Sequence, residues 1–237
     1  MQLIRHRGRR IHLPSIEPSG DAWVNRTRPG TSQTAVSWQR FRHSRRSTTD
    51  KPPNGDPVAP ELSTERLVLR GWQVDDAPAA LEIYGDTDVA RWLSPAMDKV
   101  TDVDAMRKVL AQWIRQDGDA VPPAGRWAIQ RRSDNRVIGG VVLLPLPPGD
   151  DDLEIGWQLI PEFWGHGYAT ESTRGVAQWA FTQELEEVFA VVRPGNQRAA
   201  AVARRNGMDW VGETDKYFGL TLQVYRLRPA DLVGTAG

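Results

Sequence analysis

The chain has 237 residues, of which 40% are hydrophobic and 25% charged, and its formal net charge is zero. These fractions are typical of a folded globular protein with a sizeable core. The absence of cysteine excludes a disulfide framework, a thiolate metal site and catalysis through a cysteinyl intermediate. No apolar run approaches the roughly 18 residues that a membrane-spanning helix needs. We therefore expect a cytoplasmic protein without membrane contact.

Residues 1–60 differ from the rest of the chain in composition. They carry eleven Lys and Arg against four Asp and Glu, so the remainder has an excess of seven acids. They are rich in Arg, Ser, Thr, Pro and Gly and lack hydrophobic periodicity, which predicts a basic, disordered extension. A transit peptide and residues added by an upstream start codon both fit this composition, whereas an export signal is not expected. We also do not expect nucleic-acid binding, because an Arg excess alone is poor evidence for it.

Residues 61–237 contain alternating and helical hydrophobic patterns that predict a folded domain. We expect strands at 66–70, 126–131, 137–144, 153–159, 187–193, 208–214 and 220–228. We expect helices at 75–84, from about 101 to 113, at 168–182 and at 197–206. This order predicts an α/β domain with a mixed sheet of about seven strands and about four helices.

A glycine-rich turn, 164–170, connects the predicted strand at 153–159 to the helix that follows. Gly165 and Gly167 permit positive φ angles and let a ligand approach the backbone closely. A helix start after such a turn leaves several N–H groups pointing the same way at the positive end of the helix dipole. The turn is therefore suited to a phosphate or pyrophosphate. Taken alone, it is equally compatible with an ordinary turn between a strand and a helix.

Four segments occur in an order and spacing that a known family shares. They are 64–70, 154–157, 164–171, and Asn196 followed by 204–208. Together they resemble GNAT-fold N-acetyltransferases of the RimJ/RimL-like branch. The resemblance covers about 170 residues and none before Glu61. It implies a GNAT fold whose sheet is splayed between the fourth and fifth predicted strands, 153–159 and 187–193.

The resemblance also implies acetyl-CoA as co-substrate and no metal. The backbone of the 165–170 turn would hold the pyrophosphate, and the pantetheine arm would lie between the two splayed strands. Backbone groups at about 157–160 would polarise the thioester carbonyl. The implied cofactor-binding residues are Leu159, Ile160, Trp164, Gly165, His166, Gly167, Tyr168, Ala169, Thr170 and Asn196. By its local sequence alone, Asn196 could equally be a helix N-cap.

Glu154 is the expected catalytic base. An amine must lose its proton before it can attack a carbonyl, and Glu154 is the one acid in an otherwise apolar strand. Alternation sets Glu154, Gly156 and Gln158 on one face, which would line the acceptor cleft. The alternative is a solvent-facing carboxylate on a half-exposed strand. His166 is expected to face solvent or a phosphate rather than to act as a base.

The general acid is not evident from the sequence. The RimJ/RimL branch usually has a serine three residues after the asparagine, where this chain has Ala199. A methyl group cannot donate a proton to the leaving thiolate. Tyr217, Tyr225, Thr170 and Ser172 are the possible hydroxyl donors, and the sequence does not rank them.

These features predict an N-acetyltransferase that moves an acyl group from acetyl-CoA to a primary amine by direct transfer in a ternary complex. The acceptor would be a protein N-terminus or a small amine, and acidic residues such as Asp86, Asp88 and Asp152 favour a cationic one. The alternative is a non-catalytic acyl-CoA-binding regulatory module of the same fold, which the missing serine would suit. We expect a monomer or a homodimer.

Overall fold

The computed structural model describes residues 59–146, 152–217 and 219–233, which form one mixed sheet covered by helices. The strands are β1 (Leu62–Ser63), β2 (Leu67–Gly71), β3 (Gly125–Arg131), β4 (Val137–Pro145), β5 (Leu153–Leu159), β6 (Val188–Val192), β7 (Asp209–Thr214) and β8 (Leu222–Leu227). The helices are α1 (Ala77–Tyr84), α2 (Thr87–Leu93), α3 (Val103–Asp119), α4 (Tyr168–Thr182), α5 (Gln197–Arg205) and α6 (Pro229–Val233). Two 3₁₀ turns, η1 (Val74–Asp76) and η2 (Pro161–Phe163), precede α1 and α4.

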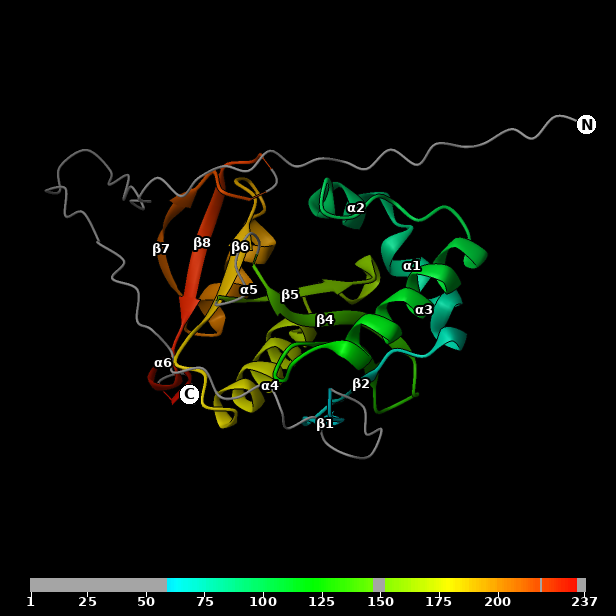
Figure 1. Ribbon diagram of the computed structural model, residues 1–237, viewed down its shortest axis with the longest axis horizontal. Helices are drawn as coiled ribbons and strands as arrows, with labels where there is room; N and C mark the ends of the chain where they lie inside the picture. Colours follow the sequence, from blue (N-terminus) through cyan, green and yellow to red (C-terminus); the bar gives the residue numbers. More distant parts are fainter. Residues whose placement is uncertain (1–58, 147–151, 218, 234–237) are drawn as a thin grey trace, which may run out of the picture.

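The sheet has the strand order β1-β2-β3-β4-β5-β6-β8-β7. Neighbours are antiparallel except β5 and β6, which are parallel. In Figure 1, β4 and β5 run almost horizontally, whereas β6, β7 and β8 stand nearly upright beside them. The sheet therefore has two differently oriented parts that meet at the β5–β6 boundary. This architecture confirms the predicted α/β GNAT fold, with the seven expected strands and the two-residue β1 at the edge.

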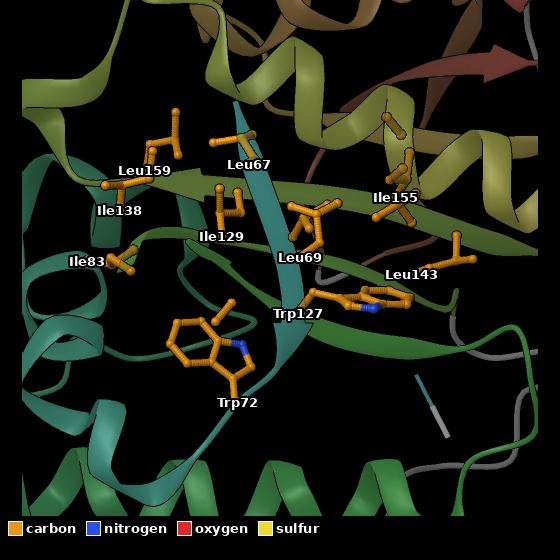
Figure 2. Close-up of a cluster of buried hydrophobic side chains, with 14 of the residues drawn as sticks. Leu67, Leu69, Trp72, Ile83, Trp127, Ile129, Ile138, Leu143, Ile155 and Leu159 are labelled. Atoms are coloured by element: carbon orange, nitrogen blue, oxygen red, sulfur yellow. The ribbon is translucent and has the colours of Figure 1, made fainter. Parts of the chain in front are cut away.

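The core fills both faces of the first part of the sheet. On one face, Leu67, Leu69 and Ile155 are almost fully buried and lie between the strands and α4, as Figure 2 shows. Trp72 lies on the opposite face, toward α1 and α3. Because β5 alternates between these faces, its odd-numbered residues pack toward α4 and its even-numbered residues face the side of α1. The candidate site lies on this second side.

The predicted helices are present, with differences at their ends. Asp102 caps α3 by accepting a hydrogen bond from the Ala105 N–H, and the helix extends beyond Trp113 to Asp119. Helices α2 and α6 were not predicted, since each is too short to display helical periodicity. Asp86 nevertheless caps α2 through the N–H groups of Asp88 and Val89.

The predicted extension lies outside the described residues apart from its last two, so its disorder stays a prediction. Ala59 is buried in the core, and the Pro60 carbonyl accepts a hydrogen bond from Trp127 Nε1 at 2.8 Å. Among the helices described, none combines the length and the apolar composition that crossing a bilayer requires.

Substituting Gly139 by alanine tests the close approach of β4 to β5. A Cβ at this position would overlap the Gln158 carbonyl oxygen and the Leu159 side chain. We expect Gly139→Ala to lower the free energy of unfolding by about 1–3 kcal/mol in urea denaturation. The control is Gly118→Ala in α3, where a Cβ meets nothing within 4 Å. It should raise that free energy by about 0.4–1 kcal/mol. A neutral Gly139→Ala would contradict the packing described here.

Candidate active site

A cleft opens where β5 separates from β6. The two strands share a single register pair, Glu154 with Phe189, close to where both strands begin. Beyond this pair a cavity of about 210 Å³ lies between them. It is lined by 154–158 of β5, Val142 of β4, 190–193, the segment 92–96 at the end of α2, Asn196, Ala199, Leu220 and the first residue of β8, Leu222. This volume is below the roughly 300–1,000 Å³ of typical small-molecule pockets, so it suits the reacting groups of larger ligands.

The backbone of β5 presents alternate groups to this cleft. The Ile160 N–H donates to the Ile138 carbonyl of β4 at 3.0 Å, so the even-numbered residues of β5 direct their backbone groups toward β4. Trp157 and Leu159 consequently direct theirs toward β6. Of the residues expected to polarise a carbonyl, Trp157 lines the cleft and directs its backbone toward β6, whereas Leu159 has only its N–H on that side, because its carbonyl accepts from Trp164 Nε1. Ile160 is not in position, because its carbonyl also accepts from the Phe163 N–H and its side chain is buried.

Glu154 occupies the narrow end of the cleft. It is half-buried, and removal of its carboxyl group from water raises its pKa from an ordinary value near 4.5 to about 7. A hydrogen bond from the Val191 backbone N–H acts in the opposite direction, since it favours the charged form. The carboxylate therefore bridges the two strands where they part. A carboxyl group with a pKa near neutrality can act as a general base or acid at physiological pH.

Gln158 and Tyr84 form a polar contact on the same face of β5. Tyr84 Oη donates to Gln158 Oε1 at 3.3 Å. The Tyr84 ring packs edge-on against Trp72 and Trp113, with centroids 6.2 and 5.1 Å away. Burial raises the pKa of Tyr84 well above its usual range, so the hydroxyl keeps its proton. No motif in the sequence pointed to Tyr84.

The turn before α4 has the expected geometry of an anion site. Gly165 and Gly167 adopt φ angles of +82° and +83°, and Gly167 is the N-cap of α4. In the described structure, no side chain caps this helix start. The N–H groups of 168–170 have no intrahelical acceptor, since they belong to the first turn. They can bind a phosphate oxygen together with the positive end of the helix dipole.

A network from the β1–β2 region holds this turn. Glu171 in the first turn of α4 accepts hydrogen bonds from Thr64 Oγ1 at 2.6 Å and from the backbone and Nε of Arg66, both at 2.7 Å. Arg66 Nη1 donates to the His166 carbonyl at 3.0 Å, and the guanidinium lies 4.7 Å from the centre of the Tyr168 ring. Arg66 therefore fixes the turn and offsets the Glu171 charge beside it. Both residues lie in the matching sequence segments, but their contact was not foreseen.

The other predicted residues lie around the open end of the cleft. Trp164 Nε1 donates to the Leu159 carbonyl at 2.9 Å, and the Arg198 guanidinium lies 4.7 Å from a Trp164 ring centre. His166 is exposed, and its Nδ1 lies 3.0 Å from the Trp164 carbonyl, within the turn rather than in the cleft. Asn196 both lines the cleft and caps α5 by accepting the Ala199 N–H at 3.1 Å.

The four candidate hydroxyl donors differ in their surroundings. Ser172 is buried in α4 and donates to the Ala169 carbonyl, while Thr170 lies in the first turn of the same helix. Tyr225 donates to Gln223 Oε1 at 3.4 Å. Tyr217 is the candidate with an electrostatic link to Glu154: burial, with the charges of Asp152 and Glu154, raises its pKa to about 12. It packs with Phe189, the register partner of Glu154, and with Leu222 of the cleft wall.

Among the residues that the structure describes, no cluster of three or more His, Asp or Glu side chains could hold a metal ion.

Comparisons with known proteins identify relatives of this chain. YoaA of Bacillus subtilis (strain 168), named an uncharacterized N-acetyltransferase, is 28% identical over 160 residues, which cover 67% of this chain and 88% of YoaA. The FsC-acetyl coenzyme A-N(2)-transacetylase of Aspergillus fumigatus is 30% identical, with 64% of this chain and 66% of that protein covered. The solved structure of RimL, a ribosomal L7/L12 alpha-N-protein acetyltransferase in complex with coenzyme A, superposes with a TM-score of 0.60. It is 21% identical and covers 71% of this chain and 98% of RimL, a likeness that concerns the fold.

The model of the acetyltransferase (GNAT) domain family matches residues 66–209. This match includes the strands that separate, Glu154, the turn before α4 and Asn196. The chain belongs to the GNAT acetyltransferase family.

Proposed function

We propose that this protein transfers the acetyl group of acetyl-CoA to a primary amine by direct attack within a ternary complex. The observation that carries the proposal is a carboxyl group of near-neutral pKa, Glu154, in the cleft between β5 and β6, on a strand followed by a helix start that no side chain of the described residues caps. The turn at 165–170 takes the pyrophosphate, and the pantetheine arm lies along the β5 edge formed by the Trp157 backbone and the Leu159 N–H. A protein N-terminus or a small amine enters from the face shared by Glu154, Gly156 and Gln158.

Glu154 accepts a proton from the acceptor ammonium, directly or through water. The neutral amine nitrogen attacks the thioester carbonyl carbon, and a backbone N–H of the β5 edge stabilises the oxyanion. The carbon–sulfur bond then breaks, the thiolate takes a proton, and the nitrogen releases its remaining extra proton to solvent. The products are the N-acetylated amine and the free thiol of CoA. Proton exchange with solvent restores the two protein groups.

We assign the proton donor to Tyr217. With a pKa of about 12, its hydroxyl is protonated between about pH 7 and 12, where Glu154 is ionised. It is buried beside the strand pair that carries Glu154. Tyr217 would then replace the serine that the RimJ/RimL branch usually has at the position of Ala199. The same alanine supports the second candidate, a regulatory module that binds an acyl-CoA without turnover, which predicts CoA binding but no thiol release with any amine.

Gly167→Ala tests the seat of the pyrophosphate. Alanine at φ +83° costs about 1–2 kcal/mol, and its Cβ would lie 3.3 Å from Arg66 Nη2. We expect the Kd for CoA, measured by calorimetry, to rise about tenfold. Gly207→Ala is the matched control, since Gly207 has the same φ outside the turn. It should lower stability without changing the Kd. An unchanged Kd in Gly167→Ala would place the phosphates elsewhere.

Glu154→Gln tests the base through the pH dependence of kcat/KM. Wild-type activity should fall as pH drops through about 7, because protonated Glu154 cannot accept a proton. The variant should lose on the order of 10²- to 10⁴-fold at pH values below the pKa of the acceptor amine. The loss should shrink above that pKa, where the neutral amine is abundant. A variant profile parallel to wild type would remove Glu154 as the base.

Tyr217→Phe tests the proton donor. We expect kcat to fall on the order of 10²-fold, with little change in the KM for acetyl-CoA, because the hydroxyl acts on the leaving sulfur and not on binding. Tyr225→Phe is the control, since its hydroxyl is engaged with Gln223 and should be dispensable to within about twofold. Equal effects of both substitutions would point to packing rather than proton donation.

A further inference from the structure

Gln158 is a polar cleft residue to which the proposed reaction gives no role. It lies on the face of Glu154 and Gly156 and lines the cleft. Its Oε1 accepts from Tyr84 Oη at 3.3 Å. Its Nε2 extends back along the strand, 3.8 Å from the place where a Cβ on Gly156 would be. Within the described part of the chain, Nε2 donates to no protein acceptor.

Tyr84 holds this orientation of the amide. Its side chain is 3% exposed and is packed between Trp72 and Trp113. Gly140 leaves the space for its hydroxyl, since a Cβ there would lie 2.5 Å from Tyr84 Oη. The structure places Gln158 Oε1 beside Tyr84 Oη, and a phenol that keeps its proton can donate to it. The amide NH₂, which can only donate, is therefore the end that faces the cleft.

Gln158, which offers the Nε2 donor, and Glu154, the proposed base, lie on either side of Gly156. Gly156 separates Glu154 from Gln158 on the same face and carries no side chain, so substrate atoms can lie against the strand there. Alternate residues of a strand are roughly 6.8 Å apart, and Nε2 reaches back by about one such interval. An amine beside Glu154 therefore brings the atoms next to it within reach of Nε2.

We propose that Gln158 Nε2 donates a hydrogen bond to a carbonyl oxygen on the carbon adjacent to the acceptor amine. Gln158 is then a specificity-determining residue and Tyr84 a positioning residue. The preferred acceptors are α-amino carbonyl compounds, such as amino-acid amides and peptide N-termini, over plain alkylamines. This inference rests on the proposed function, because it takes the amine to lie beside Glu154.

A neutral carbonyl fits the cleft better than a carboxylate does. The nearest ionisable group on this face, Glu154, is an acid and would repel an anion. Arg193 also lines the cleft, but its Nη1 donates to the carbonyls of Arg91 and Ser94 at 2.6 and 3.2 Å. That guanidinium fixes the end of α2 against β6. The cleft therefore offers an uncharged donor in Gln158 and a cation already engaged by the protein.

The test compares alaninamide with 2-aminobutane, in which an ethyl group replaces the carboxamide. The kcat/KM of each amine is measured by thiol release for wild type, Gln158→Leu and Tyr84→Phe. Dividing the kcat/KM of a variant by that of wild type for the same amine removes the effect of that amine's basicity. We expect Gln158→Leu to lower kcat/KM about tenfold for alaninamide and less than about twofold for 2-aminobutane. Tyr84→Phe should lower it about threefold for alaninamide alone, because the amide is free to turn.

Two results would overturn the proposal: equal losses with both amines, or no loss with alaninamide in either variant. A larger loss with free alanine than with alaninamide would overturn the carbonyl assignment and indicate a carboxylate. If no amine releases thiol, the proposed function fails, and calorimetry of N-acetylalaninamide with the CoA-saturated protein decides this inference separately. A tenfold weaker Kd in Gln158→Leu would support it, and an unchanged Kd would contradict it. Circular dichroism checks that each variant is folded.

Discussion

The separation of β5 from β6 is the constraint on which the rest of the site depends. These parallel strands pair at Glu154 and Phe189 and then diverge, so the backbone edge formed by Trp157 and Leu159 has no strand partner. An unpaired edge inside a sheet is costly unless a ligand, a side chain or water satisfies it. On the facing edge of β6 a side chain does so, because the Glu154 carboxylate accepts the Val191 N–H. Farther along, the edge is available to an extended ligand.

The position of Glu154 explains both its contact and its chemistry. At the point where the strands part, it is enclosed enough to lose hydration but still borders the cleft. Burial raises its pKa more than the single hydrogen bond from Val191 lowers it. The result is a carboxyl group that titrates near neutral pH without a charged partner. One feature of the backbone thus creates the cleft and raises the pKa of the carboxyl group that borders it.

The walls of the cleft come from elements distant in sequence, and arginines join them. Arg66 ties the β2 end of the sheet to the turn before α4, about a hundred residues farther along the chain. Arg193 ties the end of β6 to the end of α2 across a similar separation. Both guanidiniums donate to backbone carbonyls, so each fixes the course of the chain and not only a side chain. The turn before α4 and the end of α2 are therefore both held to strands of the same sheet.

The sequence alone determined the fold, the strand that carries Glu154 and the turn before α4, because hydrophobic alternation, helix caps and glycines act over a few residues. Tertiary structure decided which of these groups meet. Ile160 is adjacent to Leu159 in sequence, yet its backbone is engaged with β4 and η2, since alternate residues of a strand face opposite neighbours. Tyr84 reaches Gln158 from a helix 74 residues earlier, through a space that Gly140 leaves. Tyr217 differs from the three other candidate hydroxyls in the charges of Asp152 and Glu154 that act on it. No local pattern encodes such contacts, because they arise when the sheet brings distant segments together.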